Sequence, residues 1–132
     1  MIRNIKLLFV VVAVAGLVSA SSCTSSQNSP ASRVDAESAF DKAEAAFEQE
    51  DYATAESNYA IAVEGGLPVD LLGPAFLKRG IALGHLGRYE EAMKSIDEGA
   101  QGVGDQEVKE AKAQVLLAQG DTEGAKQVMK GQ

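Results

Sequence analysis

The chain has 132 residues, with one cysteine, no tryptophan and a formal net charge of −7 at pH 7. A single cysteine excludes an intrachain disulfide, so packing must hold the fold together. The negative balance disfavours nucleic acid and anionic lipid headgroups as partners, because attraction to phosphate needs clustered Lys and Arg. We therefore expect no nucleic-acid partner.

Residues 1–22 have the order of a secretory signal peptide. Arg3 and Lys6 give a positive start, residues 7–18 carry no charge, and small residues precede Cys23. As a helix, the uncharged run would span about 18 Å, whereas the hydrocarbon core of a bilayer is about 30 Å thick. The segment is therefore predicted to be cleaved rather than to cross a membrane permanently. Its removal leaves ten basic and 19 acidic side chains, so the mature chain is more acidic still.

Two cleavage sites compete. Residues 18–20, Val-Ser-Ala, suit an ordinary signal peptidase, which would leave Cys23 as a free or intermolecularly paired thiol. Residues 20–23, Ala-Ser-Ser-Cys, resemble the lipobox of bacterial lipoproteins, and we favour this site because the one cysteine directly follows the apolar run. The resemblance implies cleavage before Cys23, a diacylglyceryl group on its sulfur and an acyl chain such as palmitate on its amine. Several acyl chains would hold the protein firmly on a membrane.

The same resemblance bears on location. In lipoproteins of the enterobacterial type, an aspartate after the cysteine favours the inner membrane, and Thr24 stands at that position. The expectation is a bacterial cell envelope protein, anchored to the outer membrane and facing the periplasm. Residues 24–33, TSSQNSPASR, are polar and Ser-rich. Residues 23–34 are therefore predicted to be the lipidated cysteine and a flexible tether, with a reach of about 35 Å.

Three segments of the remaining chain align with one another, with offsets of 37 and 33 residues. Each has a small residue, a turn, a bulky anchor, a second small residue and a second anchor. These positions are, in order, Ala43, Gly80 and Ala113; Glu50, Gly87 and Gly120; Tyr52, Tyr89 and Thr122; Ala55, Ala92 and Ala125; and Tyr59, Ile96 and Met129. Repetition at this spacing predicts a stack of similar supersecondary units.

The segments resemble the tetratricopeptide repeat, a helix–turn–helix unit of about 34 residues. The middle copy, with Arg79-Gly80 and the run Leu86-Gly87-Arg88-Tyr89-Glu90-Glu91-Ala92, carries the resemblance most specifically. The first copy departs from it at Glu50, where glycine is usual. The resemblance covers residues 35–132, with units near 36–72, 73–105 and 106–132. It implies an all-α fold: a short solenoid of about three repeats and six helices.

Apolar spacing near 3.6 residues supports helices throughout this region. We predict them near residues 35–49, 52–64, 70–86, 89–101, 105–119 and 121–131. Gly87 suits a helix C-terminus, Pro74 suits a first helical turn, and Asp105 and Asp121 suit helix caps. The chain stops at the sixth helix without a polar capping helix. Its exposed end is frayed, tolerated or covered by a second copy, and self-association is therefore one partner that we consider.

Reactive groups are scarce in residues 35–132. His85 is the only histidine, and no cysteine remains there. One histidine without partners cannot form a zinc site, which needs three or four ligands. No serine or cysteine stands in a recognisable nucleophile motif. We expect no catalytic residue, no metal and no cofactor, and hence no enzyme.

What remains is a binding surface. In the repeat family the first helix of each unit lines a concave groove, which implies that a peptide or protein partner lies against these helices. Phe40 and Phe47 are the expected anchors, because aromatic residues dominate binding hot spots. The alternative is that some of these residues pack between units. Carried over position by position, the groove residues are Glu37, Phe40, Glu44, Phe47, Leu77, Ile81, His85, Glu107, Glu110, Gln114 and Leu117.

Lys42, Arg79 and Lys112 share one repeat position and suggest a basic strip, or alkyl stems that cover a neighbouring helix. The leading hypothesis is a lipid-anchored envelope scaffold or adaptor that binds a protein of the cell envelope in its groove. The second hypothesis is a self-associating structural spacer without a dedicated ligand.

Overall fold

The computed structural model of the protein describes residues 30–131, which form six α-helices and one short 3₁₀ helix with no strand among them. The predicted all-α class is therefore confirmed for this part of the chain. The helices are α1 (Pro30–Glu48), α2 (Tyr52–Glu64), α3 (Val69–His85), α4 (Tyr89–Gly99), η1 (Ala100–Gly102), α5 (Asp105–Gln119) and α6 (Thr122–Lys130).

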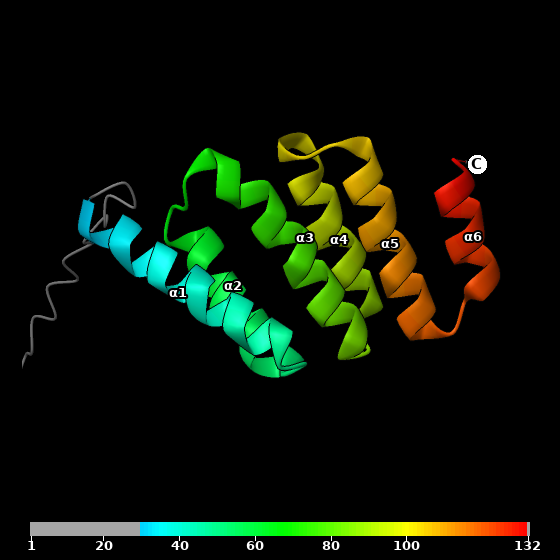
Figure 1. The fold of residues 1–132 in the computed structure, drawn as a ribbon, viewed down its shortest axis with the longest axis horizontal. Helices are drawn as coiled ribbons and strands as arrows, with labels where there is room; N and C mark the ends of the chain where they lie inside the picture. Colours follow the sequence, from blue (N-terminus) through cyan, green and yellow to red (C-terminus); the bar gives the residue numbers. More distant parts are fainter. Residues whose placement is uncertain (1–29, 132) are drawn as a thin grey trace, which may run out of the picture.

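The helices pair in chain order into three hairpins, α1–α2, α3–α4 and α5–α6, which follow one another along the long axis of the molecule (Figure 1). Contacts between hairpins join α2 to α3, and both α3 and α4 to α5. One core cluster links the first hairpin to α3, and a second links α3, α4 and α5. The core is thus a continuous layer between neighbouring helices rather than one central cluster.

Most helix boundaries lie within two residues of those predicted, and α2 and α5 coincide with them. The exception is α1, which begins at Pro30 instead of residue 35. Proline is well accommodated at a first helical position, because the backbone N–H that it lacks has no partner inside the helix there. Residues 30–34 of the predicted tether are therefore helical, and Cys23 with the rest of the tether and the signal segment lies outside the described residues.

The helix ends confirm some predicted signals and correct others. The Asp121 carboxylate accepts the Gly124 N–H at 2.8 Å and caps α6 as predicted. The N-cap of α5, however, is Gly104, and Asp105 is the first helical residue. Pro74 lies inside α3, because that helix already begins at Val69.

Each hairpin turns through a residue in the left-handed backbone region. Gly87 and Gly120 have φ angles of 77° and 88°, and Glu50 has a φ of 57° at the equivalent position of the first hairpin. For a residue with a Cβ this conformation costs roughly 1–2 kcal/mol. The first hairpin therefore keeps the turn of the other two even though its sequence departs from their pattern.

The paired helices approach closely at the predicted small residues. Ala43 and Ala55 are fully buried between α1 and α2, and Ala92 is fully buried between α3 and α4. At Gly80 a Cβ would lie 2.5 Å from Ile96 Cγ1 and 2.9 Å from the Ala92 carbonyl oxygen. The second hairpin therefore requires glycine at this crossing.

Gly80→Ala tests this requirement. Overpacking a core typically costs about 1–3 kcal/mol, which exceeds the gain of about 1 kcal/mol in helix propensity. The neighbours cannot move aside cheaply, because Ile96 is fully buried and the second contact is backbone. We expect a lower free energy of unfolding in urea titrations followed by circular dichroism.

Gly104→Ala is the control, since a Cβ there meets only the Glu107 carboxylate at 3.7 Å. It should cost less than Gly80→Ala. Equal stability of the Gly80 variant and the wild type would contradict the close crossing.

Candidate functional site

A hollow of about 180 Å³ lies between α3 and α5, the first helices of the second and third hairpins. Its apolar lining includes Leu77 and Ile81, which are only 6% and 8% exposed. Glu107, Glu110 and Gln114 project from α5 and are exposed. The arrangement offers an apolar floor with an acidic wall. The remaining lining residues are Pro74, Lys78, Val103 and Ala111.

Lys78 connects this hollow to the first hairpin. Its Nζ atom forms an ion pair with the Glu44 carboxylate and lies 6.0 Å from the centroid of the Phe47 ring. Glu44 also accepts a hydrogen bond from the Tyr59 hydroxyl at 2.5 Å. Burial raises the pKa of Tyr59, and the bond to Glu44 raises it further, so the hydroxyl remains a donor at neutral pH. Both oxygens of the Glu44 carboxylate thus have partners within the protein.

The aromatic side chains of α1 pack on α2. Phe40 lies edge-on to Tyr59 at 5.9 Å between ring centroids, and Phe47 lies edge-on to Tyr52 and Tyr59 at 5.7 and 6.3 Å. Both phenylalanines are half-buried. They therefore hold the hairpin together and offer a partner only part of their surface.

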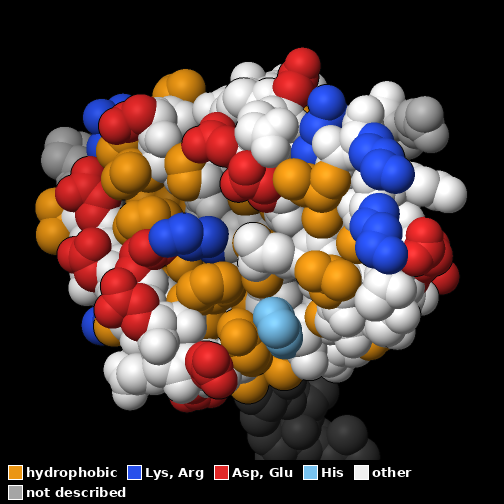
Figure 2. All heavy atoms as spheres, turned by 45° about the vertical axis from the view of Figure 1, so that its right-hand side comes forward, with side chains coloured by type: hydrophobic (Ala, Val, Ile, Leu, Met, Phe, Trp, Pro, Cys, Tyr) orange, Lys and Arg blue, Asp and Glu red, His pale blue; other side chains and the backbone are white. Residues whose placement is uncertain are grey.

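His85, at the end of α3, is exposed and stacks on Tyr52 with 4.0 Å between ring centroids and an interplanar angle of 4°. Tyr52 begins α2, so the stack joins the first hairpin to the second. Figure 2 shows the mixed character of this side of the molecule, where hydrophobic side chains alternate with acidic and basic ones and the histidine lies among hydrophobic groups.

The predicted groove residues thus fall into three groups. Leu77, Ile81, Glu107, Glu110 and Gln114 line the hollow between α3 and α5. Phe40, Glu44, Phe47 and His85 lie in or beside the contact between the first two hairpins. Glu37 is exposed on α1, and Leu117 lines a different hollow beside α6.

Lys78 was not among the predicted groove residues. The signal was present in the sequence, because Lys78 directly follows Leu77 and precedes Ile81 by three residues, one helical turn. Residues three apart on a helix are surface neighbours, so the assignment of Ile81 to the groove would have placed Lys78 beside it.

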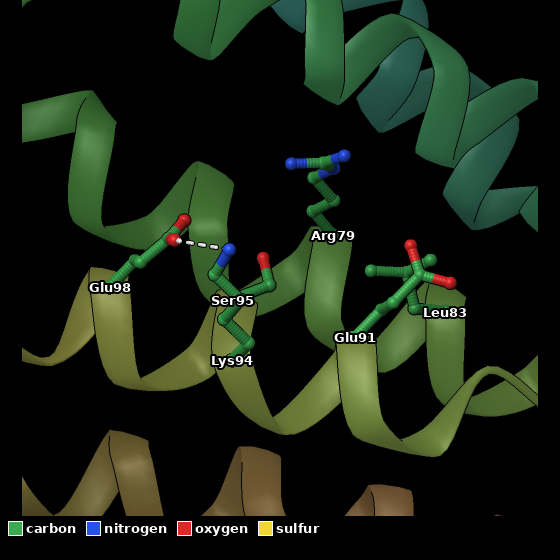
Figure 3. A pocket seen from close by; sticks show the side chains of 6 residues that line it. All are labelled: Arg79, Leu83, Glu91, Lys94, Ser95 and Glu98. Carbon is green, nitrogen blue, oxygen red and sulfur yellow. Dashed lines mark ion pairs between the residues drawn. The ribbon is translucent and has the colours of Figure 1, made fainter.

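A second hollow, of about 140 Å³, lies beside α3 and α4 and is lined by charged side chains (Figure 3). It is bordered by Arg79, Glu91, Lys94 and Glu98. Lys94 and Glu98 form an exposed pair at 3.9 Å. Cations and anions balance here, so the hollow lacks the single sign of charge that would attract an ionic ligand.

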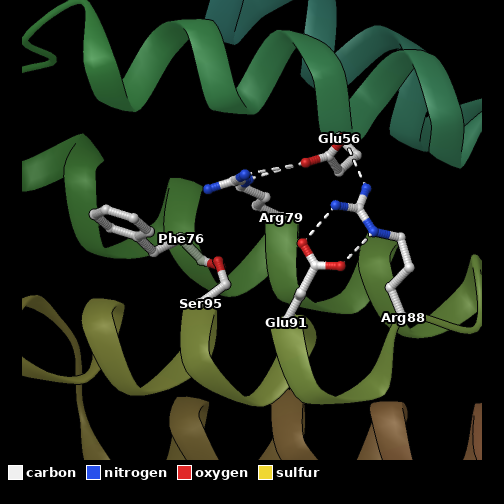
Figure 4. Close-up of polar contacts among 6 residues, drawn as sticks. All are labelled: Glu56, Phe76, Arg79, Arg88, Glu91 and Ser95. Carbon is white, nitrogen blue, oxygen red and sulfur yellow. Dashed lines mark hydrogen bonds and ion pairs between the residues drawn. The ribbon is translucent and has the colours of Figure 1, made fainter.

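Figure 4 shows the polar contacts beside this second hollow, some of which join the first hairpin to the second and some of which lie within the second. Glu56 Oε1, on α2, accepts hydrogen bonds from Arg79 Nε and Nη2 at 3.2 and 3.1 Å. Its other carboxylate oxygen, Oε2, lies 3.5 Å from Arg88 Nη1. Arg88 also donates to Glu91, and this hydrogen bond lowers the pKa of the Glu91 carboxyl. The Ser95 hydroxyl donates to the Phe76 carbonyl at 2.8 Å.

The three cations of the predicted basic strip do not form one continuous surface, because two of them pair with acids of the preceding hairpin. Arg79 pairs with Glu56, and Lys112 pairs with Asp97 at 2.7 Å. In each case a cation on the first helix of one hairpin meets an acid on the second helix of the preceding hairpin. Lys42, at the same repeat position, is exposed on α1.

Glu56→Ala should lower the free energy of unfolding by about 1–2 kcal/mol, because the half-buried Arg79 loses its charged acceptor. Glu98→Ala removes an exposed pair and should cost at most about 0.5 kcal/mol. Chemical denaturation of both variants measures the difference. Equal losses would mean that the Glu56 cluster does not hold the hairpins together.

No protein-family model matches the chain, and no curated protein or solved structure matches it significantly. Within residues 30–131, no helix is long and apolar enough to span a bilayer. The same residues contain no group of three or more His, Cys, Asp or Glu side chains that could hold a metal ion.

Proposed function

We propose that the protein is a lipid-anchored scaffold of the bacterial cell envelope that holds a segment of a partner protein in the hollow between α3 and α5. The proposal rests on the meeting of five predicted groove residues, from α3 and α5, around one hollow. The arrangement of three helical hairpins in series supports the resemblance to tetratricopeptide repeats. A fold by itself does not identify a function. The class of ligand is therefore inferred from the side chains that line the hollow.

The hollow favours a segment with an apolar side chain next to a basic one. Leu77 and Ile81 would take the apolar group, since burying such a side chain contributes about 1.5–3 kcal/mol. Glu107 and Glu110 supply the negative charge that would pair with Lys or Arg of the partner. Lys78, the cation at this hollow, is engaged with Glu44 and so does not cancel that charge.

Glu110→Lys/Gln114→Lys tests the groove. Both side chains are exposed, and the one hydrogen bond of Glu110, from Gln106, is also exposed, so the fold should persist. Crosslinking in the native envelope followed by mass spectrometry should recover a partner with the wild type and at least about tenfold less with the variant.

Gln49→Lys/Glu64→Lys is the matched control, because it makes the same charge change at exposed positions of the first hairpin, which contributes no residue to the lining of the hollow. It should recover the partner like the wild type. A partner list unaffected by the groove variant would refute binding at this hollow.

The membrane anchor is a separate part of the proposal and rests on the position of Cys23 after the apolar run. A folded domain attached through several acyl chains stays at the membrane without a spanning helix. The described helices would then face partners in the periplasm.

Metabolic labelling with an alkyne analogue of palmitate tests the anchor. The wild type should carry the label, and Cys23→Ala should lose it and leave the membrane fraction. Cys23→Ser controls for the size of the side chain and should behave like Cys23→Ala. Label retained without the cysteine would refute the lipid anchor while leaving the groove proposal open to its own test.

A further inference from the structure

The C-terminal end of the helix stack has an apolar hollow of about 480 Å³ between α5 and α6. Its lining includes the buried Ala113 and Ala125 and the large side chains of Leu117 and Met129, which are 54% and 44% exposed. Lys126 and Lys130 border it. Such large exposed apolar side chains around one hollow distinguish this end from the acidic and mixed surfaces elsewhere.

The same repeat positions are covered in the two preceding hairpins. Ala55 and Tyr59, equivalent to Ala125 and Met129, are fully buried in one cluster with Ala75 and Ala82 of α3. The first helix of the next hairpin therefore covers the first hairpin.

The second hairpin is covered in the same way by α5. Gly84, equivalent to Leu117, lies so near this helix that a Cβ would be 3.0 Å from Val115. The Tyr89 hydroxyl donates to the Ala118 carbonyl at 3.3 Å. The surface at the C-terminal end thus occupies the repeat positions that receive a helix at the earlier contacts. Leu117 stands where the second hairpin has Gly84, so an incoming helix would lie farther out than α5 does.

The charges at this end are the reverse of those at the earlier contacts. There the receiving helix offers an acid, Glu56 or Asp97, to a cation of the incoming helix. The equivalent positions in α6 are Lys126 for Glu56 and Lys130 for Asp97. Lys126 pairs with Glu123 at 2.7 Å, but both side chains are more than 60% exposed, and such a pair contributes only about 0–1 kcal/mol. An incoming helix would therefore need acidic side chains.

A second copy stacked head to tail does not meet this need. Its α1 would occupy the place that α3 takes on the first hairpin, and it would present Ser38, Lys42 and Ala45 where α3 presents Ala75, Arg79 and Ala82. The α1 residues are exposed, and Lys42 would face Lys126. Charge repulsion between these two lysines opposes the contact.

We propose that the C-terminal end, formed by α5 and α6, binds an acidic amphipathic helix of a partner protein. Small apolar residues of that helix would fill the hollow over Ala113 and Ala125, and its carboxylates would pair with Lys126 and Lys130. Figure 2, which turns the α6 side of Figure 1 toward the viewer, shows Lys and Arg side chains in a row on that side and acidic ones mainly on the other. This surface is separate from the hollow between α3 and α5, so the molecule would hold two partners or two segments of one.

The test uses two synthetic amphipathic helical peptides with the same Ala/Leu face, one flanked by glutamates and the other by lysines. Fluorescence anisotropy measures their binding to the full chain in mild detergent. The glutamate peptide should bind at least about tenfold more tightly, and this preference should fall with added salt. Lys126→Glu/Lys130→Glu should reverse the preference, while circular dichroism should show unchanged helix content, because both lysines are exposed.

Glu110→Lys/Gln114→Lys should bind the glutamate peptide no more weakly than the wild type, which separates this surface from the groove. Binding that ignores the charge reversal, or that is lost in the groove variant, would overturn the proposal. Light scattering tests whether a second copy binds at this end instead. A dimer of the wild type that Met129→Glu converts to a monomer would assign this end to a second copy and would also overturn the proposal.

Discussion

The fold depends on how closely the two helices of each hairpin approach one another. At the second hairpin this distance admits no side chain at Gly80, because Ile96 and the Ala92 carbonyl occupy the space. Alanines take the equivalent position in the other two hairpins and are nearly or fully buried there. Close pairing lets bulky residues such as Tyr59, Leu83 and Ile96 fill the remaining volume. Each hairpin thereby presents a regular surface to the next one.

The contacts between hairpins combine apolar packing with oriented ion pairs. Arg79 pairs with Glu56 and Lys112 with Asp97, so at successive contacts equivalent cations meet acids that stand one helical turn apart in the repeat. The more exposed pair of Lys112 with Asp97 adds little stability by itself. Both pairs penalise a wrong register, because a slipped helix would leave charges unpaired. The same register aligns Leu77 and Ile81 with Glu107 and Glu110 across the hollow. The candidate groove is therefore a consequence of how the hairpins stack.

Local signals in the sequence identify much of this architecture. Asp121 caps α6 as predicted, and Gly87 and Gly120 adopt the left-handed turn that their positions suggest. The cap of α2 by Asp51 was not predicted, and Asp105, which was, is the first residue of α5. The start of α1 was missed, because TSSQNSPASR has the composition of a linker, and Pro30 is compatible with both a linker and a first helical turn.

The site was harder to predict than the fold. Helical spacing assigns Leu77 and Ile81 to one face, but it does not reveal that they are floor rather than rim. The pairing of Glu44 with Lys78 and the stacking of Tyr52 on His85 each join different helices, so they depend on tertiary distances that no local pattern contains. Leu117 follows the groove pattern by position, yet it borders the end of the stack because no fourth hairpin follows α6 within the described residues.

The most direct test of the close helix pairing is a nuclear Overhauser spectrum of the isotopically labelled chain. Close pairing predicts strong cross-peaks from the Gly80 α protons to the Ile96 methyl groups, within the second hairpin, and from the Gly84 α protons to the Val115 methyl groups, across the contact with the third. Helical chemical shifts without these cross-peaks would contradict it, because the helices would then form without packing at their small residues.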